Sequence, residues 1–519
     1  MGIGYLKVNL FAGRHALPMV NDRVLIKNTD GKILYDLITD ENGMTETISL
    51  STPDKQNSQS PFINMPKFSI VDIEIPALDG HKKAIVHWAE VFDTITTIAS
   101  IQLHPLIPGE SAQHDIDEYY IPIEHAVDMP RYSQIDSENH NLDNTHKNFS
   151  VENAQTRQVA MALANDVPIP EYITVHLGAP NEYARNITIP FVDYIKNVAC
   201  SEIYPTWHES ALYANIYAQI SFALNRMFTL WYKSRGFAFD ITSLPAFDQA
   251  FIEGRCIFDN INLIVNEIFN QFLRRENRLE PFFASYCNGT TSICEGMSQW
   301  GSQLMAEEGY TPIQILRYYY FQDIQIVESN NFGEQLALFP GTPLREGDSG
   351  EDVRLMQLFL NRIYANFSAI PVMIPNGIFG SEMTESVITF QNAFNLIENG
   401  IIGKDTWYEI VRIYVAVTDL ASLNSLGIRI SAGEIPPNVT IQVGLSGELV
   451  SKLQFLLDYI SEFYPVIPTI MRTSRFSYNT ETAVIEFQKN FGLVANGIVD
   501  ATTWQKLYSV YFAIVSTFE

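Results

Sequence analysis

The sequence has few cysteines, few positive charges and no long apolar run. Four cysteines in 519 residues are too few to build a fold around disulfides. Lysine and arginine number 33 against 59 acidic residues, so the net charge is −26. A field of that sign repels nucleic-acid phosphates and anionic membrane surfaces, so we expect neither as a partner. No segment approaches the ~20 uninterrupted apolar residues of a membrane span, and the N-terminus lacks the apolar core of a signal peptide.

The rest of the composition favours several packed domains. Hydrophobic residues make up 46% of the chain and charged residues 18%, and at roughly 150 residues per domain the length predicts three or four domains. Residues 1–125 contain short alternating runs separated by Asp-Gly and Asn-Gly pairs, which predict an all-β sandwich-like domain. Residues 126–167 are mostly polar and aperiodic, as in a linker.

Residues 168–335 mix both periodicities and predict a central α/β (α+β) domain. Two strand-like runs lead into a helix, and long amphipathic runs then predict helices over residues 211–236, 258–275 and 298–320.

The C-terminal part contains an internal repeat, visible at a gapless offset of 97 residues. Each copy predicts a small three-helix module with a short third helix around a tryptophan, over residues 342–415 and 439–513. The offset superposes Gly350 on Gly447, Gln357 on Gln454, Phe379 on Phe476, Phe390-Gln391 on Phe487-Gln488, and Trp407 on Trp504.

Both copies resemble the peptidoglycan-binding type 1 domain. The first reads REGDSGEDVRLMQLFLNRI, then NGIFGSEMTESVITFQNAF, then NGIIGKDTW; the second lacks the glycines that flank Phe476. The resemblance implies binding to cell-wall glycan or stem peptide. We expect Leu358, Phe390, Trp407 and their counterparts to pack the module rather than to contact ligand.

The central segment resembles the stage II sporulation protein D/LytB domain, a family of lytic transglycosylases acting on peptidoglycan. Two ordered signatures carry the resemblance: VDYIKNVACSEIYPTWHESALYANIYAQISFALNR and, about 95 residues later, CEGMSQWGSQLMAEEGYTPIQILRYYY. The family's glutamate matches Glu202, which the sequence places between an apolar strand and the segment Ile203 to Trp207.

Lytic cleavage requires few catalytic groups. One carboxylic acid protonates the departing oxygen, and its carboxylate then takes the proton of the muramic C6 hydroxyl, which closes on C1 to give a 1,6-anhydro sugar. The internal nucleophile removes the need for the second carboxylate of ordinary glycosidases. A single sheltered glutamate with a raised pKa is sufficient, so we expect Glu202 to be catalytic and no cofactor to be required.

Other residues of the two signatures are predicted to bind the sugar or to pack the core. Ser298 and Gln299 are expected to line the cleft and hydrogen-bond the sugar. Tyr204, Trp207 and Trp300 are either stacking platforms or core residues.

Two further acids near these signatures have ordinary explanations. Glu209 is expected to cap the following helix, and Glu295 to be a solvated loop acid.

The cysteines do not indicate a metal site. The central histidines are His176 and His208, none follows in the chain, and no compact spacing of four nitrogen and sulfur ligands occurs. Cys287 and Cys294 either form a loop disulfide or remain free thiols, while Cys200 and Cys256 are expected to be buried apolar residues.

Nearly all of residues 1–415 resembles the SleC family of clostridial spore cortex-lytic enzymes, although the second C-terminal copy goes beyond that arrangement. The resemblance implies a location in the spore cortex or coat region and an N-terminal prosequence removed by a subtilisin-like germination protease. We place the break between residues 150 and 170, where the polar linker meets the first catalytic strand.

Two other function classes compete with the lytic enzyme. A catalytically inactive peptidoglycan-binding spore structural protein would retain the same fold. An amidase or endopeptidase would need a metal or thiol constellation that the sequence lacks.

Overall fold

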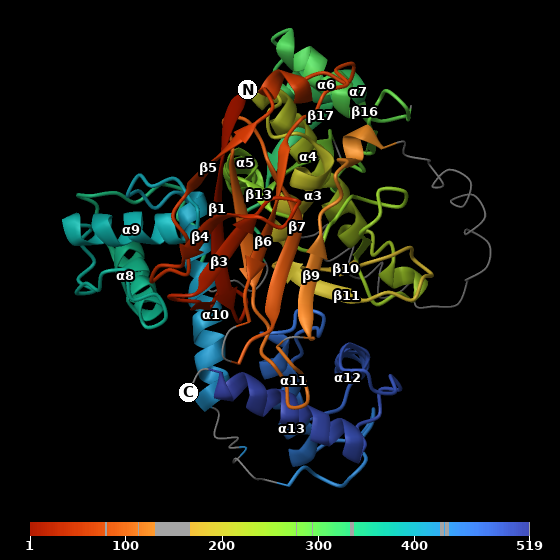
Figure 1. Ribbon diagram of the computed structural model, residues 1–519, viewed down its shortest axis with the longest axis vertical. Helices are drawn as coiled ribbons and strands as arrows, with labels where there is room; N and C mark the ends of the chain where they lie inside the picture. The colour runs from red at the N-terminus through yellow and green to blue at the C-terminus, as the bar shows by residue number, and fades with distance from the viewer. Residues whose placement is uncertain are drawn as a thin grey trace.

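The computed structural model describes residues 1–77, 80–112, 114–129, 167–276, 278–292, 294–332, 337–425, 430 and 435–517. We refer to residues 1–129 as the front domain, 167–332 as the central domain, 337–425 as module 1 and 435–517 as module 2. The front domain is built of β-sheets, the central domain mixes helices and strands, and both modules are helical (Figure 1).

The front domain consists of two sheets packed face to face. Alternate residues point inward from both, among them Val8 of β1 and Ile73 of β6, and share one apolar core. The first sheet contains β1 (Gly2–Ala12), β2 (Leu17–Pro18), β5 (Ile48–Thr52) and β8 (Thr96–Gln102). The second has the order β4 (Ile33–Ile38), β3 (Arg23–Lys27), β6 (Ser69–Ile75), β7 (Lys83–Val91) and β9 (Ile116–Tyr120). Short 3₁₀ helices span Lys55–Ser58 and Ala126–Asp128.

The boundary between the front and central domains is crossed by a shared sheet and a buried charge cluster. The two-residue strand β13 (Ile257–Phe258) of the central domain pairs antiparallel with β8. Beside it, Arg255 Nη2 lies 2.8 Å from Glu90 Oε2, whose other neighbour is His125 Nε2 at 2.7 Å. All three side chains are buried, so the two domains form one continuous structure.

The central domain begins with the hairpin β10 (Tyr172–His176) and β11 (Asn186–Pro190), joined by β12 (Ile241–Thr242). Its largely buried helix α4 (Glu209–Phe228) lies beside α3 (Phe191–Glu202) and α5 (Asp259–Ile268). The remaining elements are a 3₁₀ helix at Lys233–Arg235, the pair β14 (Gln271–Arg275) and β17 (Ile324–Glu328), the pair β15 (Tyr286–Cys287) and β16 (Met297–Ser298), and the helices α6 (Gln299–Glu307) and α7 (Pro312–Tyr319).

All three long helices predicted in the central domain were wrong in extent. The helix expected over 258–275 ends at Ile268 and gives way to β14, whose Phe272 and Leu273 are buried by sheet pairing. The helix expected over 298–320 is two helices, separated at Gly309, which has the left-handed φ of 89° that ends a helix. The helix expected over 211–236 stops at Phe228.

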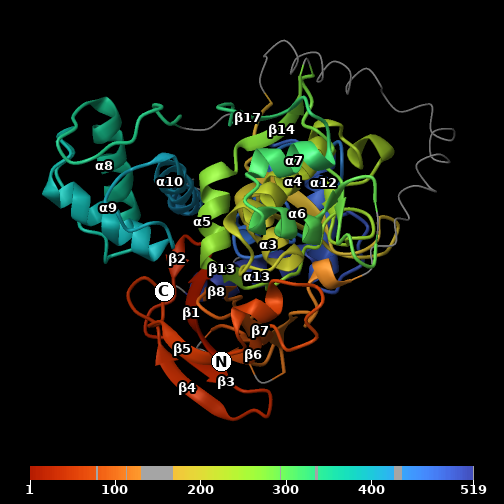
Figure 2. The same ribbon diagram turned by 90° about the horizontal axis from the view of Figure 1, so that it is seen from above.

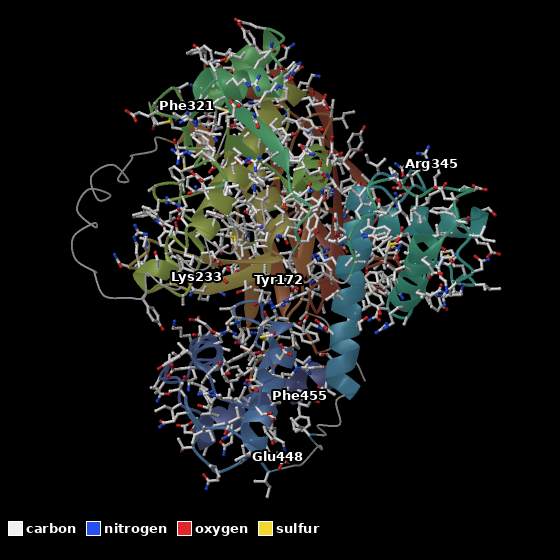
Figure 3. The ribbon with its side chains drawn as sticks, turned by 180° about the vertical axis from the view of Figure 1, so that it is seen from behind. Tyr172, Lys233, Phe321, Arg345, Glu448 and Phe455 are labelled. Atoms are coloured by element: carbon white, nitrogen blue, oxygen red, sulfur yellow. A yellow bond between two sulfur atoms is a disulfide. The ribbon has the colours of Figure 1, made fainter. Side chains whose placement is uncertain are left out.

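The modules share one design of three helices. Module 1 contains α8 (Glu351–Tyr364), α9 (Ser381–Ala393) and α10 (Lys404–Ser425), and module 2 contains α11 (Glu448–Ser461), α12 (Tyr478–Asn490) and α13 (Ala501–Ser516). The third helix is the longest in each, so the expectation of a short one was wrong. Figure 3 shows Tyr172 of β10 where the central domain meets module 2, with Phe455 and Glu448 of α11 below it.

Two glutamines that recur at the 97-residue offset, Gln391 and Gln488, have the same structural role in their modules. Gln391 Oε1 accepts the backbone N–H groups of Asn399 and Gly400 at 3.0 and 2.9 Å, and its Nε2 donates to the carbonyl of Ile401. Gln488 makes the equivalent bonds in module 2. Each glutamine thus fastens the second helix to the turn before the third.

The apolar residues expected to pack the modules are buried, with one exception. Phe390, Trp407 and Trp504 are fully buried, as expected. Leu358, however, is 43% exposed, so its predicted core position was wrong, whereas its counterpart Phe455 is 1% exposed.

Both modules are docked on the rest of the protein. Helix α10 lies against α5, and the Lys404 ammonium donates to Asn270 Oδ1 at 2.9 Å. In module 2, the hydroxyl of Tyr464 donates to the carbonyl of Pro105 in the front domain, and the carbonyl of Pro465 accepts the N–H of Thr188 in the central domain. In Figure 1, module 1 projects to one side and module 2 lies below the sheets.

The lost glycines of module 2 have a measurable consequence. Ser474 has a φ of 57°, where Gly377 of module 1 has 74°. A non-glycine residue in that region carries strain of about 1 kcal/mol. We therefore expect Ser474→Gly to raise the unfolding midpoint in urea by the equivalent of about 1 kcal/mol, and Gly377→Ser to lower it, because its Cβ would lie 3.1 Å from the Gly350 carbonyl oxygen.

The control is Ser451→Ala, which removes the 2.6 Å hydroxyl contact between Ser451 and Ser474 without changing the backbone. A loss of stability in Ser474→Gly equal to that of Ser451→Ala would show that the hydroxyl contact outweighs the strain.

Candidate active site

Glu202 is the last residue of α3 and is 0% exposed. The apolar segment before it is a helix rather than the predicted strand. Helix α3 follows directly on β11, and Phe191, Ile195 and Val198 form its buried face. The chain leaves α3 in an extended conformation at Ile203 and enters α4 at Glu209, so Glu202 lies in the corner between two packed helices.

Three hydrogen-bond donors of the central domain hold the Glu202 carboxylate. Its Oε1 accepts the N–H of Ala250 at 2.8 Å and the hydroxyl of Tyr286 at 3.3 Å, and its Oε2 accepts Nε2 of Gln299 at 3.1 Å. Gln299 lies 97 residues downstream, in the second signature, so the fold brings both signatures together. A buried carboxylate needs such donors because removing it from water is costly.

A polar layer surrounds these donors inside the apolar core. Gln249 Nε2 donates to the Tyr286 hydroxyl oxygen at 3.0 Å, and the Tyr194 hydroxyl donates to Gln249 Oε1 at 3.0 Å. Burial raises the pKa of Tyr194 well above its usual value, so this hydroxyl stays a proton donor.

The predicted aromatic residues form one buried cluster. The ring centroids of Trp207 and Trp300 are 4.8 Å apart, and Tyr204 lies 6.1 Å from Trp300. All three are buried in the intact chain. As placed here they are core residues, and their predicted role as stacking platforms remains a prediction.

The front domain covers this aromatic cluster. The carbonyl of Ser58 accepts Nε1 of Trp207 at 3.0 Å, and Gln59 Nε2 donates to the carbonyl of Thr206 at 2.8 Å. The Lys67 ammonium lies 4.8 Å from the Tyr204 ring centroid and 5.6 Å from that of Trp300. We call residues Asp54 to Lys67 the covering loop.

Ser298 and Gln299 have distinct positions. The Ser298 hydroxyl oxygen accepts the N–H of Gly301 at 2.9 Å and so caps α6. It is partly exposed, whereas Gln299 is fully buried beside Glu202. Gly289, with a φ of 78°, has no room for a Cβ, which would lie 1.7 Å from the Ser298 hydroxyl oxygen.

The cysteines separate into two kinds. Cys287 and Cys294 form a disulfide that closes the loop before Ser298, and Glu295 in that loop is exposed. Cys200 and Cys256 are free and buried, and burial raises the pKa of each thiol to about 12, which makes them unreactive.

Two absences hold for the described part of the chain. Among those residues, no three histidine, cysteine, aspartate or glutamate side chains are grouped so as to hold a metal ion. Within the same part of the chain, no helix has the length and apolarity to span a membrane.

Sequence reasoning missed three contributors to the site. Ala250 acts through its backbone, which no side-chain pattern reveals. Tyr286 directly precedes Cys287 and could have been suspected from that position, whereas Lys67 lies in another domain and gave no signal.

Comparison with known families bears on the C-terminal half. Residues 349–410 and 446–507 each match the sequence profile of the peptidoglycan binding domain. Both C-terminal modules are peptidoglycan-binding domains. The matches begin next to α8 and α11 and end within α10 and α13, so each peptidoglycan-binding domain covers one three-helix module.

The geometry at Glu202 predicts how its variants behave. In Glu202→Gln, the new amide oxygen can still accept from Ala250 and Tyr286, and Gln299 can turn its amide to present Oε1, which has no hydrogen-bond partner among the described residues. We expect this variant to unfold within about 1 kcal/mol of the wild type, and Glu202→Leu to lose about 2–4 kcal/mol because buried donors lose their acceptor.

Urea unfolding followed by circular dichroism measures both variants. The matched controls are Glu295→Gln and Glu295→Leu in the exposed loop, which should change nothing. Equal stability of Glu202→Leu and Glu202→Gln would contradict the assignment of the three donors.

Proposed function

We propose that this protein is a peptidoglycan lytic transglycosylase of the stage II sporulation protein D/LytB type, which uses Glu202 as its only acid and base. The observation that carries the proposal is the hydrogen bond between Glu202 and Gln299, which joins the two signatures of that family in one buried site. Peptidoglycan binding by the two modules supports the substrate class and a location at the cell wall. The resemblance of the domain order to SleC supports the spore cortex as the proposed location.

The donors around Glu202 fix the orientation of the carboxyl group that the proposed reaction uses. Tyr286 and Gln299 orient the carboxyl group, and Ala250 N–H fixes one oxygen. In the reaction the free proton of the carboxylic acid passes to the departing glycosidic oxygen. The carboxylate then takes the proton of the muramic C6 hydroxyl while the C6 oxygen forms the bond to C1.

Mass analysis of the fragments that a chain beginning at Val167 releases from purified cortex tests the reaction class. We expect 1,6-anhydro ends, 18 mass units lighter than hydrolysed ends because no water is added, and no detectable fragments from Glu202→Gln. Since that variant retains the fold, its loss of lysis would be chemical. Reducing ends that carry added water, or lysis by Glu202→Gln at the wild-type rate, would refute the mechanism.

One observation favours a second candidate function. Glu202 is fully buried and held by its own domain, as a purely structural acid would be. A catalytically inactive peptidoglycan-binding spore protein is therefore the alternative, and it predicts no fragments from the wild-type chain under any condition.

We further propose that the intact chain is a zymogen. The covering loop occupies the face of Tyr204, Trp207 and Trp300 on which a glycan would stack. The predicted protease break between residues 150 and 170 falls mostly outside the described residues. A cut there would leave β13 paired with β8 and Arg255 bound to Glu90, so the front domain would remain docked until it dissociates.

This arrangement predicts stepwise activation. We expect the intact chain to be inactive on soluble glycan, a chain cut between residues 150 and 166 to remain slow, and a chain beginning at Val167 to be fast. Lys67→Ala should activate the cut chain several-fold faster, because it removes the ammonium group from the aromatic cluster. The control is Lys27→Ala, which breaks an ion pair to Glu74 on the second sheet of the front domain. Equal turnover by the intact chain and the Val167 chain would exclude inhibition.

A further inference from the structure

Three ring-bearing side chains meet on the outer face of the second front-domain sheet. His87 and Trp88 come from β7 and Tyr120 from β9. The His87 and Tyr120 rings are stacked at 4.6 Å, and Trp88 meets Tyr120 edge-on at 5.6 Å. Tyr120 is 53% exposed and Trp88 is partly exposed, so the group presents aromatic surface to solvent. We call these three residues the ring platform.

A β-bulge builds this platform at a cost in backbone energy. The register of β6 and β7 shifts between Val71 and Ile73, so that His87 and Trp88 both lie opposite Asp72. Trp88 has a φ of 63°, a left-handed conformation that is rare for a bulky side chain. The Asp72 carboxylate accepts the Trp88 N–H at 3.0 Å and fixes the bulge. Glycine or asparagine would fit this position with less strain, so packing of the sheet does not explain the tryptophan.

Carboxylates lie at the edge of the platform. Asp72 Oδ2 lies 3.4 Å from His87 Nδ1, and Glu118 Oε2 accepts the Tyr120 hydroxyl at 2.8 Å. An exposed aromatic ring bordered by hydrogen-bond acceptors fits a pyranose ring, whose apolar C–H face stacks while its hydroxyl groups donate outward. The second sheet lies on the side of the molecule away from helix α7, so the platform does not belong to the candidate active site (Figure 2).

We propose that the ring platform is a glycan-binding site that takes the β-1,4-linked N-acetylhexosamine backbone of the cell wall. Both modules already hold the protein on peptidoglycan, whose polymer backbone consists of such sugars. A site tethered to a bound module meets its ligand at an effective concentration in the millimolar range, so even weak stacking adds to retention. The inference does not depend on catalysis by Glu202.

Retention of the full chain on chitin, a peptide-free polymer of β-1,4-linked N-acetylglucosamine, tests the proposal. We expect Tyr120→Thr and Trp88→Asn each to lower the retained fraction, and the double variant to weaken apparent affinity by roughly tenfold. Tyr120→Phe keeps the ring and should retain wild-type binding.

The matched control is Tyr5→Thr on β1, which removes a tyrosine that is 40% exposed on the other sheet of the same domain. If Trp88→Asn fails to fold, Tyr120→Thr at its exposed strand position still decides the question. Absence of chitin binding by the wild type, or equal losses in Tyr5→Thr and Tyr120→Thr, would overturn the proposal.

Discussion

The buried ion pair between Glu90 and Arg255 joins the front domain to the end of helix α3, the helix whose last residue is Glu202. Arg255 Nε donates to the carbonyl of Cys200 at 3.1 Å, two residues before Glu202. Carbonyl groups in the last turn of a helix have no partner within the helix, so the guanidinium satisfies one of them and offsets the negative end of the helix dipole. The pKa of Glu90 is held below its usual range by Arg255 and His125 in spite of burial, so the pair stays charged.

A second, half-buried charge cluster joins the central domain to module 1. Asp193 and Lys196 project from α3, and Glu409 and Arg412 from α10, so both signs are equally represented. The positive neighbours lower the pKa of both carboxyl groups although burial opposes this. His15 of the front domain lies beside the cluster, where burial lowers its pKa to about 4 and keeps the ring neutral. The wall-binding module is therefore fixed to the same helix that ends in Glu202.

The sequence predicted the two modules from residues that recur in both copies. It predicted the candidate site from the two segments that resemble the lytic transglycosylase family. The 97-residue offset is visible in part because Gln391 and Gln488 each make the same set of backbone bonds in their own module. The two segments that resemble the lytic family pointed to Glu202 and Gln299, but the sequence assigned Gln299 to the sugar and did not predict its hydrogen bond to Glu202. Strand β13 could not be predicted, since two residues carry no periodicity and their partner strand lies in another domain. The helix boundary at Ile268 was missed for a related reason: Phe272 and Leu273 continue an apolar pattern that sheet pairing, not helix packing, buries.

Apolar burial and specific hydrogen bonds stabilise the contact between the front domain and the aromatic cluster. Tyr204, Trp207 and Trp300 are large side chains, and burying each relative to water contributes on the order of 2 kcal/mol. The front domain adds specific bonds to this burial, including the contact of Ser58 with Thr206 at 2.6 Å and the bond that the Lys67 ammonium donates to the Tyr204 hydroxyl oxygen at 3.2 Å. A cut in the linker changes none of these interactions. It removes only the covalent tether, and with it the high effective concentration of the front domain. In the proposed zymogen, dissociation of the front domain, rather than proteolysis, would be the step that exposes the aromatic surface to glycan.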